Sequence, residues 1–252
     1  MKNVILVFSL FLGFIISAQE KLVYVEYDHG QFVNGFSNNE VLIAGSNKAI
    51  YNILELKSIE NNSEQMAGKN IKKLDFNSIK PTSFHKSKNS NIIYFDDYID
   101  DKQYFIKDTL PNLNWELLPD EKKEIQGYVC QKAKLKYRGS EFTAYYTLDI
   151  PIKFGPWKFD GLPGLIMEIQ LDDDNNYYWK ATKVIYPSNE EVNFKINKEL
   201  YKNSLRTFLN DKKKDTEEKQ RIFDEKFADG AVIIRNYKPV GPEKVYEWES
   251  KN

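Results

Sequence analysis

The sequence predicts a mainly β protein, an antiparallel meander that forms a strongly curved sheet or an open barrel, with a helical segment near the C-terminus. Three observations predict this class. Runs rich in β-branched and aromatic residues recur along the chain, most are separated by short turns, and amphipathic helical periodicity is confined to about residues 198–228. Strands that follow one another through tight turns pair antiparallel, because parallel pairing needs long crossovers.

Composition sets the first limits on function. The 252 residues are 41% hydrophobic and 14% aromatic, enough apolar surface for one or at most two folded domains. With 36 Lys and Arg against 37 Asp and Glu, no net basic excess is present to neutralise phosphates, which argues against dedicated nucleic-acid binding. Two His and one Cys exclude a zinc site of four cysteines or of two cysteines and two histidines, and they exclude an intrachain disulfide.

Residues 1–18 have the pattern of a signal peptide. Lys2 precedes an apolar run, Val4–Ile16, that is too short for a comfortable membrane span, and Ala18 supplies a small side chain before the expected cut. No Cys follows the cut to carry a lipid, so a lipoprotein is not expected. We expect export to the periplasm or beyond, no transmembrane segment after cleavage, and a single mature β-rich domain, residues 19–252; an uncleaved anchor is the alternative.

The first half of the chain predicts short strands. Residues 21–27 alternate in the manner of a strand, and 41–44 and 49–56 predict a hairpin around a turn at 45–47. The polar stretch 57–70 predicts a loop.

A second hairpin and a longer meander follow. Residues 81–90 predict a loop by composition, and 91–95 and 103–106 predict a hairpin around an acidic turn, 96–101. Five longer runs then predict the meander: 113–118, 124–137, 141–148, 165–171 and 177–186. The separating turns are predicted at 119–120, 138–140 and 172–176.

Helical periodicity is strongest late in the chain. Residues 198–210 and 216–227 predict two amphipathic helices around a polar link, with Asn197 as the cap of the first and Gly230 as the stop after the second. The remaining predictions are a strand at 231–237, a turn at 239–242 and a polar tail.

Two acidic clusters raise the question of a metal. Residues 172–176 place oxygens at the spacing that opens an EF-hand loop, but Tyr177 stands where that loop needs Gly, and Lys183 stands where it needs a bidentate Glu. The acidic turn 96–101 has the oxygens for a hard cation but no fixed pattern. We interpret both clusters as solvated turns and predict no metal site.

Few side chains suit catalysis. His29, in a predicted turn at 28–30, and His85, in a predicted loop, do not adjoin a nucleophile elbow, and no Gly-rich phosphate-binding loop occurs, so no cofactor is predicted. Cys130 lies in a predicted strand. It is a possible reactive thiol, metal ligand or half of an intermolecular disulfide, although a lone Cys is more often a small buried apolar residue, the interpretation we favour.

The most distinctive stretch is residues 154–166. Turn signals lie on both sides of two aromatic residues, and Leu162 to Leu165 can form a type II turn, because Pro163 fixes its own φ and Gly164 can take a positive φ. A turn with so many apolar residues either packs as a corner of the sheet or lines a binding site. We favour the sheet corner. The candidate binding residues are Trp157, Gly161, Leu162, Pro163, Gly164, Leu165 and Ile166.

Residues 161–166 read Gly-Leu-Pro-Gly-Leu-Ile, the signature that gives the GLPGLI family its name, and the sequence resembles that family. Further similar segments occur in the expected order at 125–133, 144–147, 150–151 and 155–156. The likeness runs from about Trp115 to Ile185. It implies an exported protein of Bacteroidota-type bacteria, and the family offers no activity that can be carried over to any residue.

Three functions from different classes remain open. The preferred hypothesis is a noncatalytic envelope binding or carrier protein whose concave sheet takes an apolar small molecule or an envelope protein. The alternatives are an envelope hydrolase that uses Cys130 or a carboxylate pair, and an assembly protein that pairs through a sheet edge. A carrier predicts an apolar pocket beside Trp157 and Leu162 with few titratable groups, whereas an enzyme predicts convergent polar residues in a cleft.

Overall fold

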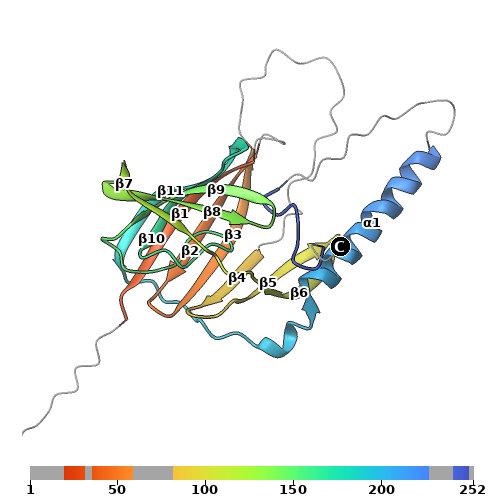
Figure 1. The fold of residues 1–252 in the computed structure, drawn as a ribbon. Helices are drawn as coiled ribbons and strands as arrows, with labels where there is room; N and C mark the ends of the chain where they lie inside the picture. Colours follow the sequence, from red (N-terminus) through yellow and green to blue (C-terminus); the bar gives the residue numbers. More distant parts are fainter. Residues whose placement is uncertain (1–19, 32–35, 59–81, 227–240, 250–252) are drawn as a thin grey trace, which may run out of the picture.

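Twelve strands of one sheet make up most of the structure, a computed structural model that describes residues 20–31, 36–58, 82–226 and 241–249. The strand order is β12-β6-β5-β4-β3-β2-β1-β11-β10-β9-β8-β7. The sheet is strongly curved and does not close on itself (Figure 1). The predicted class, a curved antiparallel meander with a helical segment near the C-terminus, is confirmed.

The elements follow in chain order. The strands are β1 (Leu22–Gln31), β2 (Phe36–Ala44), β3 (Lys48–Ser58), β4 (Thr82–Ser87), β5 (Ile92–Ile99), β6 (Lys102–Thr109), β7 (Glu116–Ile125), β8 (Tyr128–Tyr137), β9 (Ser140–Thr147), β10 (Leu165–Leu171), β11 (Asp174–Ser188) and β12 (Asn203–Ser204). The helices are η3, a single 3-10 turn (Lys198–Leu200), and α1 (Leu205–Lys226).

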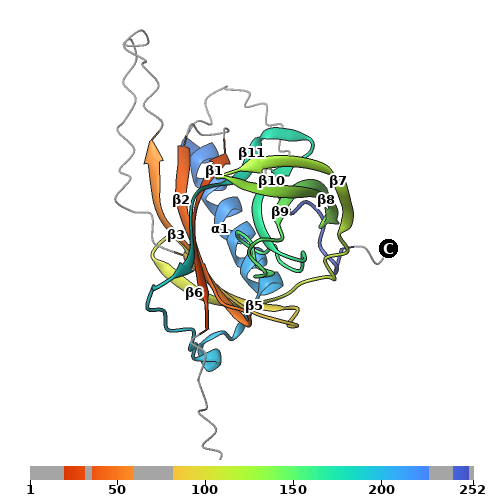
Figure 2. The same ribbon diagram turned by 90° about the vertical axis from the view of Figure 1, so that its left-hand side faces the viewer.

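The first strand lies in the middle of the sheet. β1 pairs antiparallel with β2 on one side and with β11 on the other, so β2 to β6 extend in one direction and β11 back to β7 extend in the other. Figure 2 shows the two arms facing each other across the interior of the curved sheet. The long connection between β9 and β10, residues 148–164, occupies that interior, and its Phe154, Phe159 and Leu162 are fully buried.

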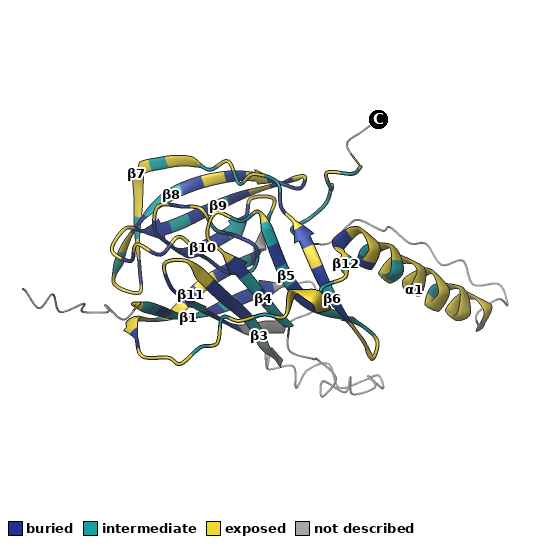
Figure 3. Ribbon diagram, turned by 90° about the horizontal axis from the view of Figure 1, so that it is seen from below, coloured by how far each residue is buried: buried dark blue, intermediate teal, exposed yellow. Residues whose placement is uncertain are grey.

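The one long helix of the described residues, α1, lies at the β12 end of the strand order, opposite β7. α1 contacts β6 and β12 through its first turns, where Leu205 and Phe208 are buried, and then extends away from the sheet with most of its surface exposed (Figure 3). The short β12 pairs with β6 in parallel and leads directly into α1.

Both predicted hairpins are confirmed, and their strands are longer than predicted. The turn after β2 closes with a hydrogen bond from the Gly45 N–H to the Lys48 carbonyl, 2.9 Å. The loop predicted at 57–70 is wrong for 57–58, which belong to β3, and its remainder, 59–70, lies outside the described residues.

The loop predicted at 81–90 is wrong for its first half, which forms β4. Phe84 and Lys86 face the interior on alternate positions of this strand. A lysine at an inward position breaks the apolar alternation on which a strand prediction depends. The turn predicted around His29 is also wrong, because β1 continues through Gly30, where the Tyr178 ring packs so closely that a Cβ would lie 2.3 Å from its Cε1.

The run predicted over 124–137 is split by a hairpin turn. Gln126 and Gly127 take φ of 52° and 79°, the pair of positive values that a two-residue turn between twisted strands requires. The turn predicted at 119–120 is instead an irregularity within β7, where the register shifts between Leu118 and Lys122.

The two predicted helices are one helix with a later start. Residues 198–204 form η3 and β12, and α1 then runs without a break through the polar link. Ion pairs on its exposed face, such as Lys219 to Asp215 at 2.7 Å, support the helix where apolar periodicity is weak. Asn197 caps η3 rather than an α-helix, and the Ser204 hydroxyl accepts the Thr207 N–H at the start of α1.

Some predictions fall where the structure is not described. The leader and its cut, Gly230, the strand at 231–237 and the first half of the turn at 239–242 lie outside the described residues. The polar tail is described over 241–249. It is not a simple solvated tail, because Tyr246 and Trp248 pack against the core.

The Gly-Leu-Pro-Gly-Leu-Ile segment is built into the core of the fold. Leu165 donates its N–H to the Ile150 carbonyl, 3.1 Å, and Ile166 donates to the Phe154 carbonyl, 3.2 Å. A Cβ on Gly164 would lie 1.8 Å from the Thr147 carbonyl oxygen, so only Gly allows the two backbone segments to approach this closely.

Replacing Gly164 with Ala should lower the free energy of unfolding by about 3 kcal/mol or more, because backbone must move to admit the methyl group. The matched control is Gly127→Ala, where the added Cβ meets nothing within 4 Å and only the positive φ is strained. That control should cost roughly 1–2 kcal/mol. Urea unfolding followed by circular dichroism measures both, and equal losses would contradict the close-approach explanation.

Candidate functional site

A cavity of about 370 Å³ lies on the concave side of the sheet. Its walls come from the sheet, the 148–164 connection, the start of α1 and residues 241–246. Side chains with rings dominate the lining: His29, Phe84, Phe95, Trp157, Tyr177, Trp179, Phe208 and Tyr246. We call this cavity the ring pocket.

Trp157 has the most unusual backbone in the ring pocket. Its φ is 46°, a left-handed value that a bulky aromatic residue rarely adopts and that typically costs about 1–3 kcal/mol. The indole ring stacks on Trp179 with centroids 5.6 Å apart and planes 11° apart. Strain at a bulky residue persists only where surrounding contacts impose it, which makes Trp157 the leading functional candidate in this wall.

Lys86 supports the turn that contains Trp157. Its buried Nζ donates to the carbonyl oxygens of Gly155 at 2.5 Å and Phe159 at 3.1 Å, the two residues that bracket the turn around Trp157. The Gly155 N–H also bonds to the Phe159 carbonyl, 3.1 Å, and closes the same turn. Burial lowers the pKa of Lys86 to about 8, although the charge of Asp160 partly opposes the shift.

A buried histidine and carboxylate lie beside the stacked indoles. His29 Nδ1 is 2.8 Å from Glu40 Oε1, and the His29 ring stacks on Trp179 with centroids 4.3 Å apart. The other Glu40 oxygen accepts hydrogen bonds from the Tyr51 hydroxyl and from Trp179 Nε1, the latter at 2.9 Å. Glu40 is therefore occupied by three protein donors, and its arrangement serves to hold rings in place.

A network of ion pairs forms another part of the ring-pocket wall. Arg138, in the β8–β9 turn, binds Asp108 of β6 through two hydrogen bonds of 2.8 and 2.9 Å, and both side chains are buried. Lys158 Nζ lies 2.8 Å from Asp108 Oδ2 and 2.9 Å from Glu243 Oε1. Glu243 also accepts from Arg138, and Glu247 adds two further bonds to the Arg138 guanidinium. The network joins four separate segments of the chain.

The network shifts the acidity of its members. Burial alone would raise the pKa of Asp108, but hydrogen bonds from Arg138 and the charge of Lys158 outweigh it and hold that pKa below its usual value. The carboxylates raise the pKa of Arg138 further above its already high value, despite the opposing effect of burial. The carboxylate of Asp108 and the guanidinium of Arg138 therefore stay charged throughout the physiological range.

The structure separates the candidate binding residues that the sequence grouped together. Trp157 lines the ring pocket, and Gly161, with φ of 89°, lines a second cavity. Leu162, Leu165 and Ile166 are buried in the core. Pro163 is exposed, and Gly164 lies against the Thr147 backbone.

The carrier hypothesis predicted an apolar pocket that Trp157 and Leu162 share. Leu162 is absent from the ring pocket, and five charged residues line it: Glu40, Asp97, Lys158, Lys212 and Glu243. Each of these has a partner within the protein, including Asp97 and Lys212, whose charged atoms are 3.8 Å apart. That part of the prediction is corrected, since polar groups converge here, but they are already engaged with one another.

Cys130 is buried in β8 and is poorly placed for chemistry. Its Sγ lies 3.5 Å from the Tyr128 carbonyl, and burial raises the pKa of the thiol to about 11, although the charge of Lys123 opposes the shift. A nucleophilic or metal-binding Cys needs an accessible thiolate. These facts count against a thiol hydrolase.

The acidic clusters have their own contacts. Asp173 pairs with Lys244, Asp100 pairs with Lys219 at 2.5 Å, and Asp96 accepts the Ser83 N–H at 3.1 Å. Within the described ranges, no group of three or more His, Cys, Asp and Glu side chains is arranged to hold a metal ion. In the same ranges, no helix has the length and apolar character needed to cross a membrane.

Sequence reasoning did not find the ion network. One signal for it exists: Tyr104, Ile106 and Asp108 share the inward face of β6, so Asp108 occupies a core position. Arg138, which binds Asp108, lies 30 residues later in the chain, and Glu243, which binds Arg138, lies a further 105 residues later. No local sequence pattern connects positions this far apart.

Residues 137–168 match one family model. Its description is "Protein of unknown function (Porph_ging)", and the matched segment includes Arg138, Trp157, Lys158 and the Gly-Leu-Pro-Gly-Leu-Ile sequence. The match supports a link to a Bacteroidota-associated family of unknown function, and it fits the predicted GLPGLI resemblance only loosely. No curated protein matches the chain by sequence.

Solved structures show a related fold. A structure of PNGF-II in space group C2 has a TM-score of 0.50 and 15% identity, over 77% of this chain and 33% of PNGF-II. A second PNGF-II structure, in space group P21, has a TM-score of 0.46 and 14% identity, over 73% of this chain and 31% of the other. The chain thus corresponds to about a third of PNGF-II, and at this identity the likeness shows the fold alone.

Replacing Asp108 with Asn should lower the free energy of unfolding by about 3 kcal/mol at neutral pH, because buried cations lose a counter-charge. The control Asp173→Asn removes an ion pair whose carboxylate is 63% exposed, and it should cost less than about 1 kcal/mol. Urea unfolding measures both variants.

Asp108→Asn also tests how the stability of the fold depends on pH. A depressed pKa stabilises the fold above the unfolded-state value, ~3.9 for Asp, and that stabilisation is lost as the pH falls through the folded value. The parent protein should therefore lose stability more steeply than Asp108→Asn below about pH 4. If the stability of the parent and of Asp108→Asn fell equally with pH, Asp108 would not be the source of the acid sensitivity.

The Cys130 thiol should not react with Ellman's reagent in the folded protein at about pH 8, because it is buried and protonated. It should react fully once guanidinium unfolds the chain. Rapid labelling of the folded protein would revive the thiol hypothesis.

Proposed function

We propose that this chain is an exported, noncatalytic binding protein of the cell envelope, and that its ring pocket takes a small ligand with flat apolar faces. The leader pattern of residues 1–18 supports export. The ring pocket supports binding, because its volume of about 370 Å³ and its lining of rings with a few fixed polar groups are typical of small-molecule sites.

The observation that carries the proposal is the strained Trp157 on the pocket wall. A positive φ at a bulky residue costs free energy, yet Lys86 and the closed turn hold the ring against Trp179. The ring is thereby fixed before any ligand arrives. Such preorganisation reduces the entropy that binding has to overcome, and stacked indoles offer large, rigid contact area.

The polar groups of the pocket favour binding over catalysis. Glu40, Lys158 and Glu243 are each engaged by two or more protein partners. Among the described residues that line the pocket there is no Ser, Thr or Cys to act as a nucleophile. A catalytic group needs a free lone pair or proton near its substrate, whereas here the charges hold the walls in position.

The sheet edge at β7 does not favour assembly by strand addition. β7 carries Pro119, which lacks an N–H to donate, and a register shift between Leu118 and Lys122. Charged residues fill much of the remainder, including Lys122 and Lys123. These are the features by which proteins protect edge strands from pairing with other chains.

The experiment is native mass spectrometry of the protein purified from its own envelope, compared with the same sample after denaturation. A bound mass that disappears on denaturation identifies the ligand. In Trp157→Gly the fraction of protein that carries this bound mass should fall at least about tenfold, because the substitution removes one of the stacked rings. The denatured parent should have the mass of a chain that begins at Gln19.

Two comparisons separate binding from folding. Trp157→Gly should be more stable than Trp157→Ala by roughly 1 kcal/mol, since Gly tolerates the positive φ. Trp115→Phe, a change of a ring outside the pocket, should keep the bound mass. A ligand retained by folded Trp157→Gly would show that the ring pocket is not its site.

A further inference from the structure

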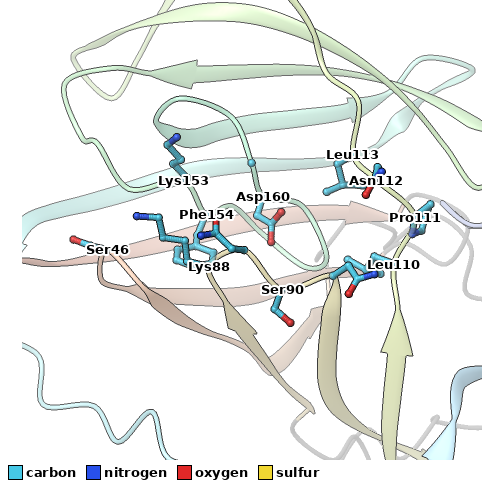
Figure 4. Close-up of a pocket in the computed structure, with 13 residues that line it drawn as sticks. Ser46, Lys88, Ser90, Leu110, Pro111, Asn112, Leu113, Lys153, Phe154 and Asp160 are labelled. Carbon is cyan, nitrogen blue, oxygen red and sulfur yellow. The ribbon is translucent and has the colours of Figure 1, made fainter.

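A second cavity, which we call the loop pocket, lies at one end of the curved sheet. Its volume is about 380 Å³, and four connections form it: β2–β3, β4–β5, β6–β7 and β9–β10 (Figure 4). The polar and charged lining residues are Ser46, Lys88, Asn89, Ser90, Asn91, Asn112, Lys153 and Asp160. The loop pocket shares no lining residue with the ring pocket.

The carboxylate of Asp160 points into the middle of this cavity (Figure 4). The backbone of Asp160 is fixed, because its carbonyl accepts a hydrogen bond from Trp115 Nε1 at 2.8 Å and because it forms a bridge with Phe154. Within the described part of the chain, the side chain has no hydrogen bond or ion pair. The fold thus holds a carboxylate in place and leaves it without a protein donor.

The surroundings of Asp160 disfavour its charged form. Burial raises the pKa of Asp160, and the charge of Lys86 opposes the shift only from a distance, because the Lys86 Nζ is engaged by the Gly155 and Phe159 carbonyls. Asp160 is half-buried, and its carboxylate is open to the cavity rather than sealed in the core. A partly desolvated carboxylate without a protein donor favours a cationic partner, and a ligand with an ammonium group supplies one.

Two lysines supply the opposite charge on the rim. Lys88 and Lys153 are exposed, and neither forms an ion pair with any described residue. Figure 4 shows both amino groups on the Ser46 side of Asp160, with Asn112 across the cavity. A bare metal ion would meet two ammonium groups here, and a simple anion would meet the carboxylate, so neither is complementary to the whole cavity.

We propose that the loop pocket binds a small zwitterion, a free amino acid or a short peptide with unblocked ends. Its ammonium group donates to the Asp160 carboxylate, and its carboxylate faces Lys88 and Lys153. Asn91 and Asn112 also line the cavity, and their amides can hydrogen-bond polar atoms of such a ligand. This inference does not depend on the ligand of the ring pocket.

The test is isothermal titration of the mature chain with dipeptides in three forms: both ends free, the N-terminus acetylated, and the C-terminus amidated. The free form should bind, and blocking either end should weaken binding at least about tenfold, because each block removes one charge-assisted contact. Failure of every free dipeptide to bind, or equal binding of all three forms, would overturn the proposal.

The variants assign each contact to its side chain. Asp160→Asn should bind free and acetylated dipeptides equally, and the double variant Lys88→Met with Lys153→Met should bind free and amidated dipeptides equally. Asp149→Asn, an exposed carboxylate on the same β9–β10 connection, is the matched control and should retain the parent's preferences. Asp160→Asn that still prefers the free N-terminus would refute the assigned contact.

Folding and the proposed function are checked in the same samples. Asp160→Asn breaks no side-chain hydrogen bond or ion pair with a described residue and removes a partly buried charge, so it should unfold at the same or a higher urea concentration than the parent. It should also keep any mass bound in the ring pocket, because the two cavities share no lining residue. Loss of dipeptide binding with that mass retained confines the effect to the loop pocket.

Discussion

The short connection between β6 and β7 is the constraint on which the rest of the structure depends. These consecutive strands lie ten places apart in the sheet, a separation of about 47 Å if the sheet were flat. The six residues between them, 110–115, span at most about 20 Å. The sheet must therefore curl until its ends approach each other. Curvature creates an interior, and the 148–164 connection fills it with Phe154, Phe159 and Leu162.

The buried ion network fixes how far the sheet curls. Arg138 lies at the end of one arm and Asp108 lies on β6 of the other, and their two hydrogen bonds fix distance and orientation together. Removing two charges from water is costly, so such a pair specifies one arrangement more than it adds stability. Lys158 and Glu243 extend the network to the interior connection and to the C-terminal segment. The ring pocket is thereby held in shape by charges that are engaged with one another, and two of them, Lys158 and Glu243, line it.

One connection supplies both cavities. Trp157 faces the ring pocket, whereas Lys153 and Asp160 face the loop pocket. The Lys86 ammonium supports the connection between these residues, because it bonds to the Gly155 and Phe159 carbonyls. The segment that matches a family model, residues 137–168, contains this connection together with Arg138. The Gly-Leu-Pro-Gly-Leu-Ile sequence therefore indicates residues that pack in the core, such as Gly164 and Leu165, more than side chains that face the cavities.

The sequence by itself determined the class of the fold, because the alternation of side chains and the turn residues act between neighbours along the chain. It placed both early hairpins and β10, and it indicated a buried Cys130. Only the tertiary structure revealed β4, since Lys86 faces inward to bind two carbonyls 69 and 73 residues away. It alone joined Arg138 to Asp108 and Glu243, and it alone showed that Trp157 and Leu162 face different surroundings. The reason is physical: local patterns report which face of an element is buried, whereas the partner of a buried charge is decided by the curvature of the whole sheet.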